Sequence, residues 1–237
     1  MHRLSPATAT SEYGTQPLRT NKIIPFIMAP IIRPATKADE AALSNICLLT
    51  ANAGTSAKDL HTDPALPGLI YSLPYVNLES TWGFVLEDDG EVVGYTLGAF
   101  DTRKFEESAE TGWWPLLKAR YGPLLQDPDA VLTPADKTYI NTIMAIPRAS
   151  DAMMAFAPAH LHIDILPSHQ RQGWGRKLIG RAIENLKENG VQSVWLGMDP
   201  KNIDAAVFYE RLGFGKVEGA QEGIMGITVQ QWEECAV

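Results

Sequence analysis

The feature that most constrains this chain is a strand, a glycine turn, a helix and a second strand in direct succession. Residues 161–166 (LHIDIL) alternate as a strand does, and the turn 170–175 (QRQGWG) contains two glycines. Apolar residues at helical spacing follow over 178–186, and Asn189-Gly190 is typical of a helix C-terminus. Residues 194–198 (VWLGM) then predict a buried strand. This order indicates an α/β fold.

The rest of the chain supplies further elements for the same fold. Residues 82–87 and 92–100 are rich in β-branched and aromatic side chains, and the Asp-Gly turn between them predicts a hairpin. The other expected elements are a strand at 31–35, a helix from Ala38 toward Gly54, a helical region at 67–78 broken by Pro74, a helix at 203–212, and strands at 214–217 and 224–229.

Composition restricts the class of protein. The 237 residues are 45% hydrophobic and 20% charged, which is typical of a globular protein. A net charge of −8 argues against broad capture of nucleic acid. The apolar stretch 23–32 is interrupted by two prolines and is too short to cross a membrane. The only cysteines, Cys47 and Cys235, form no disulfide or zinc pattern, so we expect a reducing compartment, cytoplasmic with the nucleus as an alternative.

The chain divides into an extension and one domain. Residues 1–29 are expected to be a disordered N-terminal extension. The Ser, Thr and Arg content of the first 22 residues also fits a transit peptide, and Met28 fits a later start codon. Residues 30–237 are expected to form a single domain. Within it, 101–158 looks like an insertion, either a substrate-facing lid or a helical packing layer.

The glycine turn before the helix predicts a phosphate site. A helix N-terminus offers free backbone N–H groups and a positive dipole end, and Gly173 and Gly175 allow an oxyanion to approach closely. Arg171 and Arg176 can add charge-assisted hydrogen bonds. Glycines kept for packing are the alternative interpretation. A dinucleotide pattern fails because Leu178 stands at the third glycine position, and no Walker pattern occurs.

The segment that follows the second strand makes the pattern more specific. Asn202 and residues 208–214 (FYERLGF), taken with the turn 170–175, resemble the GNAT superfamily of acetyl-CoA-dependent N-acetyltransferases. The resemblance also includes residues 32–35 (IRPA), Asp39 and the hairpin through Val93-Gly94, and leaves 101–158 unmatched. The stretches 162–167, 173–178 and 196–200 look closer still to the acetyltransferase-like domain of O-GlcNAcase and its microbial relatives.

This resemblance implies a fold and a cofactor site. The implied fold is a mixed, twisted sheet flanked by helices, with a helical insertion before the fourth strand and acetyl-CoA held where the fourth and fifth strands separate. Backbone groups of Ile163 and Ile165 would pair with the pantetheine arm, and Asn202 would hydrogen-bond the cofactor. The pyrophosphate would lie against Arg171, Gln172, Gly173, Trp174, Gly175 and Arg176.

The resemblance also implies catalytic roles. Tyr209 stands where the family places the general acid that protonates the CoA thiolate, although a buried aromatic residue with a structural role would give the same pattern. The fifth-strand position of the family's glutamate is Gly197 here, which leaves the base open. Asp164 is our candidate, and His162 shares its face of the strand. His160, His162 and Asp164 could also be a metal trio, but the sequence offers no further clear ligand, so no metal site is expected.

The sequence therefore predicts an acyltransferase that moves an acetyl group from acetyl-CoA to a primary amine of a small molecule or peptide. A catalytically silent acetyl-CoA-binding interaction module is the alternative, favoured by Gly197 and by the likeness to an accessory domain. We expect neither a nucleic acid nor a membrane as partner. Acidic residues at the start of the insertion, namely Asp101, Glu106, Glu107 and Glu110, suggest a cationic acceptor or simply a solvated surface. The acceptor and the oligomeric state are left open.

Overall fold

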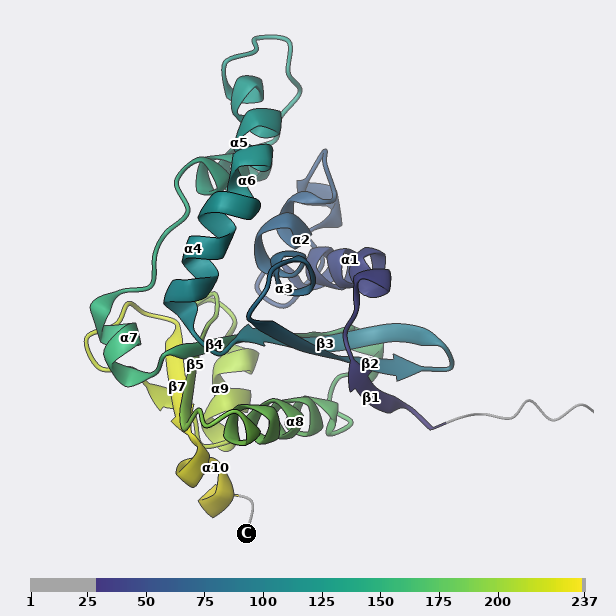
Figure 1. Cartoon of the computed structure of the whole chain (residues 1–237). Helices are drawn as coiled ribbons and strands as arrows, with labels where there is room; N and C mark the ends of the chain where they lie inside the picture. Colours follow the sequence, from purple (N-terminus) through teal and green to yellow (C-terminus); the bar gives the residue numbers. More distant parts are fainter. Residues whose placement is uncertain (1–28, 236–237) are drawn as a thin grey trace, which may run out of the picture.

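The computed structural model describes residues 29–235, in which seven strands form one sheet (Figure 1). The strands lie in the order β1-β2-β3-β4-β5-β7-β6, and β4–β5 is the parallel pair among otherwise antiparallel neighbours. Their bounds are β1 Ile31–Pro34, β2 Thr81–Asp88, β3 Glu91–Ala99, β4 Ala159–Ile165, β5 Ser193–Gly197, β6 Gly215–Lys216 and β7 Ile224–Thr228. The predicted mixed sheet is confirmed, with β4 at its centre.

Helices cover both faces of this sheet (Figure 1). The first three lie on one face, and α8 and α9 lie on the other, with α10 beside α8. The α-helices are α1 Glu40–Thr50, α2 Leu66–Tyr71, α3 Pro74–Asn77, α4 Thr102–Gly112, α5 Trp114–Tyr121, α6 Pro134–Met144, α7 Asp151–Phe156, α8 Trp174–Glu188, α9 Ile203–Arg211 and α10 Val229–Cys235. Short 3-10 helices occupy Lys37–Asp39, Lys58–Leu60, Gly122–Leu125 and Pro167–His169. No described helix is long and apolar enough to cross a membrane.

Each face of the sheet has its own apolar core. On one face, Ile179 and Ile183 of α8 pack against Trp82 and Leu161 of the strands. On the other face, Leu43 and Ile46 of α1 pack against the sheet beside Tyr95. Full burial of one such aliphatic side chain stabilises the fold by roughly 1.5–3 kcal/mol, so the amphipathic helices hold the sheet between them.

The hairpin has the turn that its sequence predicts. Asp89 and Gly90 both have positive φ, 50° and 82°, as a type I′ turn requires at its two central residues. This turn matches the right-handed twist of β2 and β3 and fixes the register between them, while the pairing of β3 with β4 brings Tyr95 opposite Asp164.

The helices expected before the fourth strand are present, and the structure gives their bounds. Residues 102–156 between β3 and β4, called the insertion below, hold four helices, α4 to α7, and α4–α6 rise away from the sheet (Figure 1). They share an apolar core with α2.

The last strand expected from the sequence, 224–229, was too long, because Val229 begins α10 instead. Thr228 and Gln231 form a capping box there, with Gln231 N donating to Thr228 Oγ1 at 3.1 Å and Thr228 N to Gln231 Oε1 at 2.8 Å. The expectation for residues 1–28 lies outside the described residues.

Candidate active site between strands β4 and β5

β4 and β5 run side by side only where they begin. Ala159 lies opposite Val194 and His160 opposite Trp195, and the two strands do not pair beyond these residues. A cleft of about 2200 Å³ lies at this separation, lined by residues of α1, β4, β5, α9, the start of α8 and the insertion. Concave sites of this kind, with a few convergent polar groups, are where proteins bind small ligands.

The backbone of β4 turns free polar groups toward the cleft. Leu166 N donates to Val93 O at 2.9 Å, so alternate residues of β4 are hydrogen-bonded to β3, and Asp164 is among them. The N–H and C=O groups of Ile163 and Ile165 therefore point the other way, toward the separation from β5. The carbonyl of Ile165 accepts a hydrogen bond from Gln170 Nε2 at 2.8 Å. The other groups of this edge, the N–H and C=O of Ile163 and the N–H of Ile165, can pair with an extended ligand as with an added strand.

The two glycines of the turn before α8 have different roles. Gly173 is the N-cap residue with φ 83°, and a Cβ there would meet nothing within 4 Å, so the space in front of it is open. A Cβ on Gly175 would lie 2.7 Å from Cζ of Phe208 in α9. Gly175 thus permits close packing of α8 on α9, while Gly173 leaves the N–H groups of a 15-residue helix accessible to an anion.

The side chains around this turn point in several directions. Arg171 and Arg176 both line the cleft; Arg171 is highly exposed and lies 3.4 Å from Asp204, while Arg176 donates to Cys235 O at 3.2 Å. Gln172 instead donates to Ser168 O, and the ring of Trp174 lies under Lys177. Within the described chain, the side chains of Gln172 and Trp174 do not line the cleft. If they contribute to a cofactor site, they do so through their backbone.

Asn202 lies at the point where α1, α9 and the cleft meet. Its Oδ1 accepts from Ala205 N at 3.0 Å and so caps α9. Its Nδ2 faces Gly54, where a Cβ would lie only 2.9 Å away and where φ is 86°. Asn202 therefore fixes the start of the helix that carries Tyr209, and its amide donors line the cleft.

Tyr209 lines the cleft from the inner face of α9. Its side chain is 7% exposed and packs beside Phe208 and Phe214. Burial raises the pKa of the Tyr209 phenol, and the negative charge of Asp164 raises it further. The hydroxyl is therefore protonated at neutral pH and can donate a proton.

Asp164 lies across β4 from the pair Ile163 and Ile165, on the face turned toward α1. Tyr95 Oη donates to Asp164 Oδ2 at 2.5 Å. Burial raises the pKa of this carboxyl to about 6, and the hydrogen bond from Tyr95 opposes that rise. A carboxyl with this pKa can exchange a proton near neutral pH.

The two histidines of β4 differ in their surroundings. His160 is 3% exposed, and its Nε2 and Nδ1 lie 2.8 Å from Tyr75 Oη and Thr102 Oγ1, so both ring nitrogens already have partners. His162 lines the cleft, and burial lowers its pKa to about 4, which leaves the ring neutral at pH 7. No group of three or more His, Cys, Asp or Glu side chains in the described chain is arranged to hold a metal ion.

The structure adds aromatic residues that sequence reasoning did not identify. Tyr71, Tyr75 and Tyr139 line the cleft around His162, with Tyr71 and Tyr139 edge to face at 6.1 Å. Together with Tyr95 they come from α2, α3, α6 and β3, which are distant in sequence. No local signal in the sequence pointed to Tyr95, because its place opposite Asp164 depends on the pairing of β3 with β4, which are far apart in the chain.

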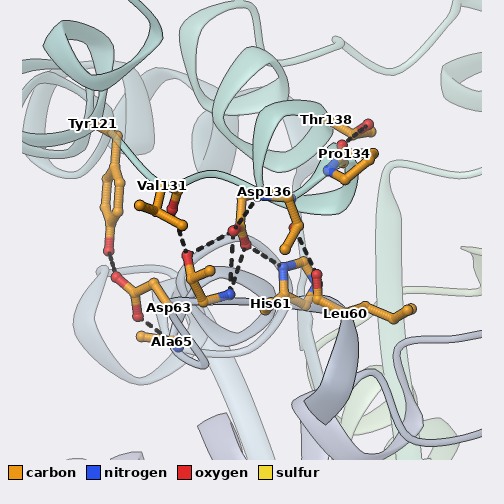
Figure 2. A network of polar contacts seen from close by, with 11 residues as sticks. Leu60, His61, Asp63, Ala65, Tyr121, Val131, Pro134, Asp136 and Thr138 are labelled. Atoms are coloured by element: carbon orange, nitrogen blue, oxygen red, sulfur yellow. Dashed lines mark hydrogen bonds and ion pairs between the residues drawn. The ribbon is translucent and has the colours of Figure 1, made fainter. Parts of the chain in front are cut away.

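A polar network holds the insertion to the α1–α2 connection (Figure 2). Asp136, fully buried at the start of α6, accepts hydrogen bonds from His61 Nδ1 at 2.9 Å, Thr62 Oγ1 at 2.7 Å and Thr133 N at 3.0 Å. These bonds lower the pKa of Asp136 to about 2 although burial acts in the opposite direction. The ring of His61 packs edge-on against Tyr139 at 4.7 Å, so this network fixes one wall of the cleft.

Comparison with known proteins decides the family. The model of the acetyltransferase (GNAT) family matches residues 61–214, well over half of the chain. This chain belongs to the acetyltransferase (GNAT) family. The crystal structure of SsHAT is similar at a TM-score of 0.72 and 33% identity, over 85% of this chain and 99% of that one. The family is one of acyltransferases that use acetyl-CoA as acetyl donor, and this is the enzyme class and the cosubstrate that the sequence predicts.

Two curated relatives cover different parts of the chain. Protein O-GlcNAcase of Rattus norvegicus is 24% identical over 231 residues, which are 94% of this chain and 24% of the rat protein. The [ribosomal protein bS18]-alanine N-acetyltransferase of Haemophilus influenzae is 44% identical over 57 residues, 24% of this chain and 38% of that protein. This chain thus spans about a quarter of the length of the O-GlcNAcase that it matches. The GNAT and O-GlcNAcase resemblances predicted from sequence are confirmed.

Proposed function

We propose that this protein transfers the acetyl group of acetyl-CoA to a primary amine by direct attack within a ternary complex. The amine nitrogen forms a bond to the thioester carbonyl carbon, and the C–S bond then breaks. The amine gives up a proton to Asp164, directly or through a water, and the departing thiolate takes a proton from Tyr209. The observation that carries the proposal is that a neutral phenol and a carboxyl of pKa about 6 line the same cleft of a GNAT fold.

The cofactor is proposed to lie along β4 and across the start of α8. The outward-facing backbone groups of Ile163 and Ile165 support pairing with the amide-bearing pantetheine arm. The open N-terminus at Gly173, the N–H groups that follow through Gly175, and the side chains of Arg171 and Arg176 support pyrophosphate binding. The free amide donors of Asn202 support a hydrogen bond to the same cofactor, while Gln172 and Trp174 contribute backbone only.

The insertion is proposed to form the acceptor side of the cleft. Trp114, Tyr139 and the carboxylates of Glu107 and Glu110 line it from this side. An amine-bearing small molecule or peptide would enter between these residues and α2. Glu106 has a structural role instead, because it binds Arg103, Arg148 and the backbone N–H of Ala149.

A silent acetyl-CoA-binding module is the second candidate function. One specific observation favours it: Gly197 is exposed at the cleft edge of β5, where the family's glutamate is expected from the resemblance. In that case the cleft would bind acetyl-CoA without a base strong enough for transfer. For either function we propose a cytoplasmic or nuclear location, supported by the free thiols of Cys47 and Cys235.

Thiol release separates these two functions. Acetyl-CoA is incubated with the protein and a panel of amines that includes polyamines, amino sugars and lysine peptides, and free CoA is measured alongside the melting temperature. Transfer predicts CoA release with at least one amine, whereas a binding module predicts only a raised melting temperature. Tyr209→Phe keeps the ring but deletes the proton, so kcat should fall by roughly 10²–10⁴-fold with little change in acetyl-CoA affinity. An active parent whose Tyr209→Phe variant keeps nearly full kcat would contradict the role of Tyr209.

A further inference from the structure

Tyr95 makes an unusual contact for a residue of the apolar core. It lies on β3 directly opposite Asp164 on β4, with 0% exposure, among Leu43, Ile46 and Leu97. Its hydroxyl donates to Asp164 Oδ2 at 2.5 Å. A buried tyrosine hydroxyl needs some partner, but here the partner is a carboxyl that lines the cleft rather than a backbone carbonyl.

The groups that face Asp164 leave Tyr95 as its main polar partner. Cys47 and Thr50 face it from α1, His162 from its own strand, Tyr209 from α9 and Tyr139 from α6. None of these side chains is cationic at neutral pH, since His162 is neutral there. Asp164 takes part in no ion pair within the described chain. Its ionised form is therefore stabilised chiefly by one hydrogen bond.

We propose that Tyr95 is the positioning residue of Asp164: its hydroxyl holds Oδ2 and leaves Oδ1 free to take the proton of the acceptor amine. This inference rests on the proposed function. In the transfer step Tyr95 keeps its own proton, the amine proton moves to Asp164, and the nitrogen lone pair forms the new bond. Tyr95 thereby sets both the direction in which the carboxyl points and the pH range in which it is ionised.

Tyr95→Phe tests this by removing one hydroxyl from a packed ring. The titration midpoint of the Asp164 carboxyl, read by NMR on protein with a ¹³C-labelled carboxyl carbon, should rise by about one unit or more because its main donor is lost. The acid limb of the kcat profile should move with it, so that kcat falls roughly threefold or more at pH 6.5 and recovers at high pH. A merely structural role would lower the melting temperature and leave both midpoints in place.

The matched control is Tyr121→Phe. Tyr121 is also buried, and its hydroxyl donates to a different carboxyl, Asp63 Oδ2, at 2.7 Å (Figure 2). This variant should leave the Asp164 midpoint where it is. If Tyr95→Phe does not fold, 3-fluorotyrosine at position 95 keeps the hydroxyl and makes it a stronger donor, and the Asp164 midpoint should then fall.

The outcomes separate this inference from the proposed function. If the parent protein is active and Tyr95→Phe leaves the Asp164 midpoint unmoved, the role of Tyr95 is overturned and acetyl transfer still stands. The same holds for 3-fluorotyrosine at position 95 if the Tyr95→Phe variant does not fold. If Tyr95→Phe shifts the titration midpoint of Asp164 but the parent protein transfers acetyl to no amine, the proposed function is overturned. The hydrogen bond then has no catalytic role. Matching shifts in the NMR titration and in the kcat profile support both.

Discussion

Asp164 and Asp136 are enclosed carboxyls in two regions of one molecule, and their surroundings drive ionisation in opposite directions. Burial alone would raise both pKa values. In the insertion, hydrogen bonds from His61, Thr62 and Thr133 outweigh burial and bring the pKa of Asp136 down to about 2. In the cleft, burial outweighs the bond from Tyr95, and the pKa of Asp164 rises to about 6. Asp136, with several donors, is a permanent anion that anchors structure, whereas Asp164, with one main donor, is a carboxyl that can exchange a proton.

The largest expected effect is on catalysis at Asp164. Asp164→Asn removes the proton acceptor but keeps the shape of the side chain, so kcat should fall by roughly 10²–10⁴-fold at pH 7.5. Stability should hold or increase, because the variant no longer buries an ionised carboxylate with few donors. Steady-state kinetics and urea unfolding measure the two quantities. If Asp164→Asn instead lost much stability and kept its kcat, Asp164 would have the structural role that is assigned here to Asp136.

The next effect is on stability at Asp136. Asp136→Ala leaves His61, Thr62 and Thr133 without their buried acceptor, and loss of one partner from such a site costs roughly 3–5 kcal/mol in the free energy of unfolding. Acetyl-CoA affinity should change little when measured well below the melting temperature, since Asp136 does not line the cleft. Calorimetry measures acetyl-CoA affinity, and urea unfolding measures stability. If Asp136 bound the ligand, Asp136→Ala would weaken acetyl-CoA affinity more than it lowers the free energy of unfolding.

The two carboxyls also give opposite pH dependence. The folded protein holds Asp136 ionised more readily than the unfolded chain does, so its contribution to stability is complete above about pH 4 and is lost as the pH falls toward 2. Asp164 is protonated more readily in the folded state, so its contribution falls as the pH rises from about 4 to 6. In Asp136→Ala the acid-side loss should become smaller, leaving the part due to Asp39, whose pKa Arg33 also lowers, while the decline between pH 4 and 6 remains.

Much of the cleft's framework could be predicted from the sequence because it depends on local signals. The alternation in 161–166, the glycine turn, and the amphipathic helix that follows it predicted β4 and α8 closely. Asn202 was predicted as a cofactor ligand; the structure adds that it caps α9, a role typical of Asn before a helix. Such signals act over a few residues, and tertiary packing did not override them here.

The rest depended on long-range pairing that no local pattern encodes. Tyr95 meets Asp164, 69 residues away in sequence, only because β3 and β4 pair in one register. His61 and Asp136 are 75 residues apart and meet because α6 docks on the α1–α2 connection. The bounds of the four insertion helices were not predicted, for a different reason. Proline can end a helix or stand in its first turn, and Pro115 and Pro134 stand in the first turns of α5 and α6.

The smallest expected effect tests whether one donor really controls Asp164. Thr50 also faces this carboxyl and favours its ionised form, but less than Tyr95 does. Its hydroxyl has a single proton, which is donated to Ile46 O at 2.9 Å within α1. Thr50→Val, which keeps the side-chain shape, should therefore move the Asp164 midpoint by well under one unit and change kcat less than about threefold. NMR titration of the labelled carboxyl beside Tyr95→Phe gives the comparison. A shift from Thr50→Val as large as that from Tyr95→Phe would mean that the Thr50 proton turns toward Asp164, and the contrast with the many-donor site at Asp136 would then narrow.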